Sequence, residues 1–430
     1  MKYVLKDLLL DSKDGEWGKG EPNDNSVAML AIRGTDFDDV RVGSLARVPL
    51  RHIPDRIARR KALRPFDIVF ETAGGSKDRP TGRSVLLKPS LFGKTTTPIT
   101  CASFARFLRI DPARADPVYI FWMLQHMYES DVLRQYHTQH TGVARYQYTT
   151  FAENEPLFLP KRDAQRRIAS VLSAYDDLIE NNTRRIAILE EMARRIYEEW
   201  FVRFRFPGFE AVQMVESELG LVPEGCKPAR LEQVCSRMNS GNTPSRSNPD
   251  YWAGGSVDWY KTKELWDGYL FESEERVSDL AVSDKKTRVF EPGTILMAIY
   301  GSPTVGRMGI TTRRAACNQA ALGMFPDTSK IQFWTLYYTL FALRAEFNNK
   351  AQGAAQQNIS KEKVAEASFV LPPMETQSRF EEIVGPMQAM LRNLQERNRN
   401  LRTTRDLLLP KLISGELDVS APPEPEALAA

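Results

Sequence analysis

Three short stretches of the sequence contain residue types that hold cofactors, metals or substrates. Residues 93–95, Gly-Lys-Thr, match the end of a phosphate-binding P-loop, but the first glycine of that motif would have to occupy position 88, which is Lys88. His137 and His140 have a spacing that could ligate a metal, yet no cysteine or third ligand is close in the sequence. Because the chain has only 4 histidines, a histidine-based active site is hard to assemble.

The third stretch, Asn-Pro-Asp-Tyr at 248–251, resembles the Asn-Pro-Pro-Tyr motif with which adenine methyltransferases bind the target amine. Such enzymes also need a strand that ends in a glycine-rich loop, which holds the methyl donor on a doubly wound sheet. The nearest candidate, ETAGGS at 71–76, lies in the other half of the chain and lacks the alternating pattern of strands and helices. A self-sufficient methyltransferase or nuclease is therefore kept only as an alternative.

The remaining candidate residues suit binding rather than catalysis. Two turns of small residues, one in each half of the chain, stand beside basic side chains, and each is followed later by a polar segment that carries an amide. Such loops let a backbone approach DNA, where Arg and Lys bind phosphates or guanine and Gln and Asn suit adenine. The candidate DNA-binding residues are Lys77, Arg79, Thr81, Arg83, Arg145, Tyr146, Gln147, Lys261, Lys263, Ser302, Thr304, Arg307, Gln356, Gln357 and Asn358. The alternative interpretation is a set of ordinary surface loops.

The elements that would position these residues are duplicated. LPKRDAQRRI at 159–168 and LPPMETQSRF at 371–380 match at Leu-Pro, Gln and Arg with a constant offset of 212 residues (371 − 159 = 212). Weaker matches lie upstream: AIRGTDF at 31–37 with WYKTKEL at 259–265, and HTGVARYQYT at 140–149 with AQGAAQQNIS at 351–360. A repeat of this length indicates an architecture of two similar halves rather than a solenoid of short units.

Each copy of the Leu-Pro motif is followed by a helical pattern with an apolar position about every 3.5 residues. The predicted interface of the helix pair consists of Ile168, Leu172, Tyr175, Ile179, Asn182, Ile186, Leu189 and Ile196 in the first helix, and Phe380, Val384, Leu391, Leu394, Asn398, Leu401 and Leu408 in the second. A seam of this length predicts two helices that pair as an antiparallel coiled coil. Asn182 and Asn398 either fix the register or mark a place where the helices separate, and Gly385-Pro386 predicts a kink or a late start of the second helix.

Composition sets wider limits. A chain of 430 residues exceeds the size of a single core, so two or more domains are expected. The net charge of +3 is small, but residues 41–64 hold seven Arg and one Lys against one acid, which fits either a phosphate backbone or a solvated basic face. Four scattered cysteines suggest reduced thiols in a cytoplasm, and no apolar run is long enough to cross a bilayer.

These patterns predict an α+β fold in which two mixed domains are separated by two long antiparallel helices with an internal pseudo-two-fold repeat. The expected boundaries are 1–158 for the first domain, 159–206 for the first helix, 207–229 for a linker, 230–370 for the second domain, 371–415 for the second helix and 416–430 for a disordered tail.

The helical stretch LPKRDAQRRIASVLSAYDDLIENNTRRIAILEEMARRIYEEWF and its partner, which ends in RDLLLPKLISGEL, resemble the conserved helical regions of specificity subunits of Type I restriction-modification systems. The two mixed domains resemble target recognition domains of that family, including GNTPSRSNPDYW and WYKTKEL at the start of the second. The likeness spans nearly the whole chain. It also implies that NPDY is a recurrent loop of such domains without a catalytic role.

The resemblance implies a cytoplasmic, non-catalytic adaptor without catalytic, cofactor-binding or metal-binding residues of its own. Its two domains would recognise the halves of a bipartite, asymmetric double-stranded DNA site. Two modification subunits would dock on the helices and methylate adenine N6 with S-adenosylmethionine, and restriction subunits that use ATP and Mg would complete the endonuclease. A third possibility, from the helices alone, is a coiled-coil scaffold that does not bind DNA.

Overall fold

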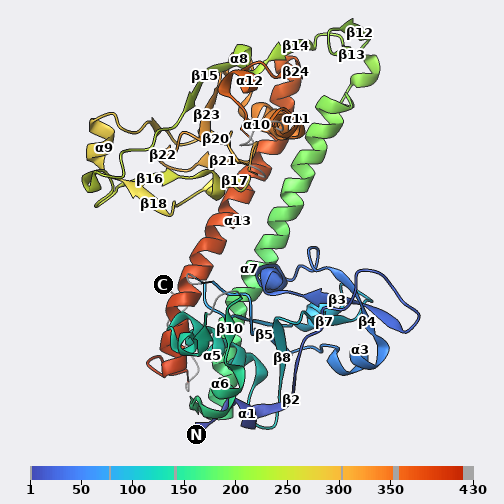
Figure 1. Ribbon diagram of the computed structural model, residues 1–430. Helices are drawn as coiled ribbons and strands as arrows, with labels where there is room; N and C mark the ends of the chain where they lie inside the picture. Colours follow the sequence, from blue (N-terminus) through green and yellow to red (C-terminus); the bar gives the residue numbers. More distant parts are fainter. Residues whose placement is uncertain (1, 77–78, 140–142, 302–303, 352–357, 420–430) are drawn as a thin grey trace, which may run out of the picture. The chain divides into compact units, whose positions relative to one another are not determined.

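The computed structural model describes residues 2–76, 79–139, 143–301, 304–351 and 358–419. The chain forms two compact units, each built from one mixed domain and parts of both long helices (Figure 1). Unit 1 contains the residues up to Thr183 together with those from Asn398 onward, and unit 2 contains Arg184–Arg397. The predicted fold class, mixed α and β with two long helices, is confirmed.

The sheets of unit 1 include an antiparallel sheet of order β2-β8-β5-β6 and a mixed sheet of order β4-β3-β7. In the mixed sheet β3 pairs antiparallel with β4 and parallel with β7. Two short pairs, β1 with β11 and β9 with β10, complete the unit. The strands are β1 (Lys2–Tyr3), β2 (Leu9–Asp14), β3 (Ser26–Ile32), β4 (Leu50–Pro54), β5 (Ile68–Glu71), β6 (Ser84–Leu86), β7 (Ile99–Cys101), β8 (Ala105–Ile110), β9 (His137–Thr138), β10 (Arg145–Tyr146) and β11 (Leu157–Phe158).

The helices of unit 1 cover its sheets. They are α1 (Leu5–Leu8), α2 (Phe37–Arg41), α3 (Asp55–Lys61), α4 (Pro89–Phe92), α5 (Pro117–Glu129) and α6 (Tyr148–Asn154). Helix α5 is apolar on most sides, and its Tyr119 and Trp122 are buried in one core with Phe70 of β5. Leu172 and Leu409, from the two long helices, belong to the same core, so the long helices are part of this unit rather than an appendage.

Unit 2 repeats this plan with additions. Its larger sheet has the order β15-β23-β20-β21-β17 and its smaller one β18-β16-β22-β19, in which β16 pairs antiparallel with β18 and parallel with β22. The strands are β12 (Met214–Ser217), β13 (Gly220–Pro223), β14 (Lys227–Arg230), β15 (Cys235–Ser240), β16 (Val257–Tyr260), β17 (Gly268–Leu270), β18 (Glu275–Val277), β19 (Val289–Phe290), β20 (Ile295–Ala298), β21 (Met308–Thr311), β22 (Ala315–Cys317), β23 (Ala321–Pro326) and β24 (Ser368–Leu371). The helices are α8 (Leu231–Val234), α9 (Asp279–Ser283), α10 (Phe333–Ala342), α11 (Arg344–Ala351) and α12 (Lys361–Ala365). Strands β12 and β13 form a hairpin within the segment expected as a linker.

The duplication extends to details that the sequence shows only faintly. The backbone N–H of Arg33 donates to Asp36 at 2.9 Å and closes the short 3-10 turn η1 (Gly34–Asp36). In unit 2 Lys261 and Glu264 close η6 (Thr262–Glu264) in the same way at 2.8 Å. The weak match of AIRGTDF with WYKTKEL therefore reflects one conserved turn at the end of a central strand.

The long helices are α7 (Arg162–Tyr197), which continues into a π-helical turn (Glu198–Val202), and α13 (Met374–Ser414). Within unit 1, Asp176 contacts Arg405 and Asn182 contacts Asn398, so the two segments run antiparallel. Within unit 2, the ring of Tyr197 lies 6.0 Å from that of Phe380. The structure buries Ile168, Leu172, Ile179, Asn182, Phe380, Val384, Leu391, Leu394 and Asn398, and half-buries Tyr175, Ile186, Leu189, Ile196, Leu401 and Leu408.

The two seam asparagines bind each other. Asn182 Nδ2 donates to Asn398 Oδ1 at 2.9 Å, and Asn398 Nδ2 donates to the Thr183 hydroxyl at 3.2 Å. Both asparagines are buried, at 9% and 3% exposure, so the helices do not separate there. Of the two open interpretations the structure favours register, because a slip by one residue would leave buried amides without partners.

Gly385 and Pro386 lie inside α13, which already begins at Met374, so the predicted late start is wrong. The residues before the proline are anchored by the core of unit 2, where Phe380 and Val384 are both fully buried. Tertiary packing of this kind outweighs the loss of one backbone hydrogen bond at proline.

The glutamine of the repeated motif has the same role in both units. Gln165 accepts from the backbone N–H of Asp116 at 3.0 Å and donates to the carbonyl of Pro160 at 2.9 Å. Gln377 accepts from the backbone N–H of Gln332 at 2.8 Å and donates to the carbonyl of Pro372 at 2.8 Å. Asp116 and Gln332 precede α5 and α10, so each glutamine joins the start of a long helix to the start of a domain helix.

We expect Gln165→Met and Gln377→Met each to lower the free energy of unfolding by about 1–3 kcal/mol, because each leaves a buried backbone N–H and carbonyl without partners. Chemical denaturation followed by circular dichroism measures the change. Arg166→Met, an exposed change beside Gln165, is the matched control. Equal stability of the glutamine variants and the control would show that these bonds do not hold the helices to the domains.

Two general expectations concern the thiols and the membrane. Cys101, Cys226, Cys235 and Cys317 are all free, and burial raises the pKa of Cys101 and of Cys317 to about 12, which makes both thiols unreactive at neutral pH. Among the residues that the structure describes, no helix is both long and apolar enough to cross a membrane.

Candidate nucleic-acid interface

In unit 1 the two predicted DNA-binding segments lie together. The loop between β5 and β6 (residues 72–83) meets β10 through an isolated bridge between Ala73 and Arg145. Around it, Gly74 donates to the carbonyl of Ala144 at 3.1 Å and Tyr146 donates to that of Thr72 at 2.8 Å. Two segments more than 60 residues apart thus form one surface.

Unit 2 has the same arrangement. The loop between β20 and β21 (residues 299–307) meets Asn358 through a bridge between Tyr300 and Asn358. Ile359 N–H donates to the carbonyl of Ile299 at 2.9 Å, and Gly301 N–H donates to Asn358 Oδ1 at 3.3 Å. We call these two structures the paired loops. They occupy equivalent places in the two sheets. One connects β5 to β6, with β8 on the other side of β5, and the other connects β20 to β21, with β23 on the other side of β20.

Three of the predicted contact residues of unit 1 lie inside the domain. Thr81 is fully buried, and its backbone N–H and hydroxyl lie 3.1 and 3.0 Å from His137 Nδ1. Tyr146 is buried among Phe70, Tyr136 and Phe151, and burial raises the pKa of its hydroxyl. These buried side chains support the paired loop from the interior of the domain.

Arg83 is the third. Its guanidinium binds Glu71 through Nη2–Oε1 at 2.7 Å and Nε–Oε2 at 3.0 Å, and also donates to the carbonyl of Gly34 at 2.8 Å. Although burial disfavours the cation, the hydrogen bonds and charge of Glu71 raise the pKa of Arg83 above its ordinary value. Since both oxygens of Glu71 are engaged, Arg83 is held as a permanent charge within the loop base.

Arg79, Arg145 and Gln147 are exposed on the paired loop of unit 1. Arg79 closes a tight turn, because its backbone N–H donates to the carbonyl of Ser76 at 3.2 Å. Gln147 precedes α6, so its side chain stands at the start of that helix. These are the predicted residues that the structure leaves on the surface of unit 1.

The basic residues predicted on η6 of unit 2 are paired with glutamates. Lys261 Nζ lies 2.6 Å from Glu275 and Lys263 Nζ lies 2.6 Å from Glu274. The hydrogen bond to Glu274 raises the pKa of Lys263. Lys263 remains exposed, and its surface ion pair is weak enough for a phosphate to compete with it.

Thr304, Arg307 and Asn358 belong to the paired loop of unit 2. The Thr304 hydroxyl donates to the carbonyls of Tyr300 and Gly301, both at 2.8 Å, and so shapes the turn. Arg307 lies over the ring of Trp266 at 4.5 Å. Arg83 and the equivalent Arg307 each face an aromatic ring, Phe37 and Trp266 respectively, but Arg83 is also bound to Glu71. The predicted residues Lys77, Ser302, Gln356 and Gln357, like His140 and the tail from residue 420, lie outside the described residues.

The catalytic candidates have structural roles. Asn248 Oδ1 accepts from the backbone N–H of Asp250 at 3.1 Å and starts the 3-10 turn η5 (Pro249–Tyr251), while Tyr251 is buried. Lys94 binds Glu180 at 3.6 Å instead of facing a phosphate loop. In the described part of the chain, no group of three His, Cys, Asp or Glu residues is placed to hold a metal.

About half of the basic run at 41–64 is neutralised. Arg41 binds Asp176 at 3.0 Å, Arg59 binds Asp55 at 2.9 Å, Lys61 binds Glu16 at 3.1 Å, and Arg47 pairs with Asp39. Exposed Arg56, Arg60 and Arg64 have no ion pair within the described ranges. The run is therefore divided between cations in ion pairs and a free basic group around α3.

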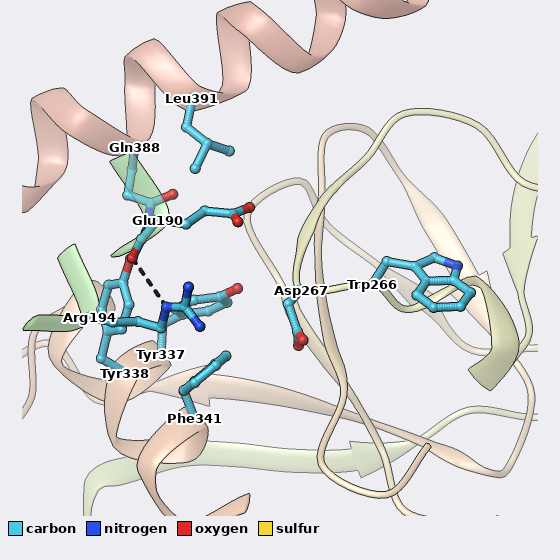
Figure 2. A pocket seen from close by; sticks show the side chains of 9 residues that line it. All are labelled: Glu190, Arg194, Trp266, Asp267, Tyr337, Tyr338, Phe341, Gln388 and Leu391. Atoms are coloured by element: carbon cyan, nitrogen blue, oxygen red, sulfur yellow. Dashed lines mark hydrogen bonds between the residues drawn. The ribbon is translucent and has the colours of Figure 1, made fainter. Parts of the chain in front are cut away.

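A polar pocket of about 150 Å³ lies within unit 2, where α7, α10 and α13 meet the turn at Trp266 and Asp267 (Figure 2). Gln388 of α13 donates to the hydroxyl of Tyr338 at 2.5 Å. Burial raises the pKa of Glu190 on α7. The volume suits about five water molecules. The pocket is too small for a nucleotide and joins the helices to the domain.

Sequence reasoning missed three exposed aromatic residues near the paired loops. Trp17 and Phe104 line a larger cavity in unit 1, and Trp266 of unit 2 is 70% exposed beside Arg307. Because these aromatic rings stand beside the paired loops, they are further candidates for the binding surface. The sequence contains these residues, but their exposure depends on chain segments distant from them.

Both units thus carry a paired loop with basic or amide side chains. Residues 223–401 match the family model of the Type I restriction modification DNA specificity domain. The MjaIX specificity subunit of a Type I restriction enzyme from Methanocaldococcus jannaschii is 28% identical over 265 residues, which are 60% of this chain and 60% of that protein. The HindI specificity subunit from Haemophilus influenzae is 21% identical over 320 residues, 61% of this chain and 69% of that one.

The crystal structure of a Type I restriction-modification S subunit from M. genitalium has the same fold, with a TM-score of 0.59 at 16% identity over 96% of this chain and 95% of that one. The family model covers residues 223–401, and the relatives and the solved structure that match are specificity subunits of Type I restriction systems. The predicted resemblance to specificity subunits of Type I restriction-modification systems is confirmed.

Proposed function

We propose that this chain is the DNA specificity subunit of a Type I restriction-modification complex in the cytoplasm. The domain of residues 1–158 recognises one half of a bipartite, asymmetric DNA site, and the domain of residues 230–370 recognises the other half. The long helices bind two modification subunits, which methylate adenine N6 with S-adenosylmethionine. Restriction subunits that use ATP and Mg complete the endonuclease.

The observation that carries this proposal is the paired loop. Both units join a glycine-containing hairpin loop to a distant polar segment through one backbone bridge, at Ala73 and Arg145 in one and at Tyr300 and Asn358 in the other. The framework is repeated while the presented side chains differ. A repeated framework with different contact residues is what the recognition of two unlike half-sites requires.

The test uses the purified chain with and without its modification partner, labelled S-adenosylmethionine and duplex DNA. We expect salt-dependent DNA binding by the chain and methyl transfer only when the modification subunit is added. Methyl transfer by the chain alone would support a self-sufficient methyltransferase. Absence of DNA binding at low salt would support a scaffold that does not bind DNA.

We expect Arg79→Ala and Arg145→Ala to weaken DNA binding at all salt concentrations, because both cations are exposed on the paired loop of unit 1. A residue that binds phosphate would weaken binding about equally for all sequences and lower the salt slope by about 1. A residue that binds a base would instead lose about 1–3 kcal/mol of discrimination at one position. Fluorescence anisotropy over a salt series distinguishes the two.

Arg195→Ala, which removes one equally exposed cation from α7, is the control for overall charge. Unchanged affinity and salt slope in both loop variants would show that DNA does not contact this surface.

A further inference from the structure

Unit 1 contains a cavity of about 610 Å³ that opens beside its paired loop. One side is formed by Ala73, Gly74 and Arg79 of the loop, and the others by Trp17, the turn at Arg33–Thr35 and the segment Ala102–Phe104. The bridge of Ala73 to Arg145 ties this wall to the segment with the other candidate DNA contacts. Any DNA on the paired loop would therefore lie at the mouth of the cavity.

The aromatic walls are held in place. Arg51 covers one face of Trp17 at 4.4 Å from the ring centroid, and its Nε donates to the carbonyl of Trp17 at 3.1 Å. Phe104 is 55% exposed, but its carbonyl accepts from the N–H groups of Thr72 and Ala73 at 2.9 and 3.2 Å. Two aromatic side chains that line one cavity suit a flat, unsaturated ring.

The polar groups of the cavity suit a nucleotide. Glu71, at the base, is neutralised by Arg83, yet its oxygens keep lone pairs that can accept from a ring amino group. A Cβ on Gly34 would lie only 2.4 Å from Glu71 Oε1, so glycine lets the backbone approach this carboxylate. Arg79 is exposed at the mouth, where it can reach a phosphate.

Unit 2 lacks these aromatic residues at the equivalent positions. Gly15 and Gly241 pack in the same way, since an added Cβ would lie 2.2 Å from the carbonyl oxygen of Cys101 and 2.1 Å from that of Cys317. Counting from these anchors, Trp17 corresponds to Thr243 and Phe104 corresponds to Ala320. Thr243 donates to Gln319 at 2.6 Å, and Ala320 is buried. The aromatic cavity is thus a specialisation of the first domain.

We propose that this cavity binds a single nucleobase displaced from the DNA stack, with Trp17 and Phe104 as the stacking surfaces. The inference rests on the proposed function. Base edges stay within an intact groove, whereas a cavity of about 610 Å³ with two aromatic walls takes a ring only when that ring leaves the stack. Stacking on an aromatic side chain contributes about 1–3 kcal/mol per base, which offsets much of the cost of unstacking.

The test is a mispair scan with the full chain bound to its modification partner. Duplexes carry the recognised site with one mispair at a time in the half-site of the first domain. A weakened pair costs less to open, so we expect roughly tenfold tighter binding at one position. Trp17→Ala and Phe104→Ala should each remove that gain, and Trp17→Phe should restore part of it. Phe158→Ala, an exposed phenylalanine outside the cavity, should leave it unchanged.

The outcomes separate the two proposals. Site-specific binding with no tighter position, or a gain that survives both alanine variants, would overturn the nucleobase site but not the specificity function. Loss of site-specific binding by the wild-type complex would overturn both. A parallel titration with nucleoside monophosphates tests whether the cavity binds a free nucleotide instead. If a monophosphate binds and Trp17→Ala abolishes that binding, while no mispair tightens DNA binding, then DNA is not the source of the base.

Discussion

Phe380→Ala is expected to lower the free energy of unfolding of unit 2 by about 3–5 kcal/mol, the usual cost of removing a buried phenylalanine. Phe380 is fully buried, and its ring centroid lies 5.0 Å from that of Phe201 and 6.0 Å from those of Tyr197 and Tyr338. It joins α13, the end of α7 and α10, so the cavity left by alanine would loosen three helices together.

Chemical denaturation of the full chain measures this loss. Ile383→Ala, one turn away on the same helix and 39% exposed, is the matched control and is expected to cost far less. A loss below about 1.5 kcal/mol for Phe380→Ala would mean that the aromatic cluster collapses around the gap, since the cost depends on how far the site relaxes.

The long helices were predictable because they depend on local pattern. An apolar position every 3.5 residues from Ile168 onward, and again from Phe380, can be satisfied only by a helix with a partner along its length. Two short apolar runs bounded by Gly and Pro, DIVFE at 67–71 and TILMAIY at 294–300, likewise contain β5 and β20, as local pattern predicts. Of the kink or late start expected at Gly385-Pro386, the late start is wrong, because packing at Phe380 and Val384 outweighs the local rule.

Contact residues were harder to predict than elements, because residue type does not reveal which partner a side chain meets. Arg79 and Arg83 are close in sequence and alike in chemistry, but Arg79 is exposed and Arg83 binds Glu71. Tyr146 and Trp17 show the converse: the predicted contact is buried, and the unpredicted residue lines a cavity. These differences depend on pairings across tens of residues, which no local spacing encodes.

The repeat also explains where the two halves must differ. Adding 212 to Asn182 gives Leu394, and subtracting 212 from Asn398 gives Ile186, so the polar pair has an apolar counterpart. The hydrogen bond from Asn182 Nδ2 to Asn398 Oδ1, at 2.9 Å, therefore fixes the register of the helices in unit 1. The duplicated framework is thus shared, whereas the amide pair, with one asparagine from each copy, and the aromatic cavity of unit 1 are not repeated.

Arg83→Met is expected to destabilise unit 1 by about 3–5 kcal/mol, because it leaves the Glu71 carboxylate buried without its cation. Glu71 is 3% exposed and both of its oxygens are bound by Arg83. The double variant Glu71→Gln with Arg83→Met should recover a large part of the loss, since no unpaired charge remains. Denaturation of the two single variants and the double variant gives the coupling energy.

The same cycle decides how Arg83 takes part in DNA binding. If Arg83 only supports the paired loop, the double variant should bind DNA with nearly the wild-type salt slope once it is folded. If Arg83 itself contacts a phosphate, the slope should fall by about 1 in the double variant although stability is recovered. A coupling energy near zero would contradict the structural role, because the ion pair seen at 2.7 Å would then contribute nothing to the loop.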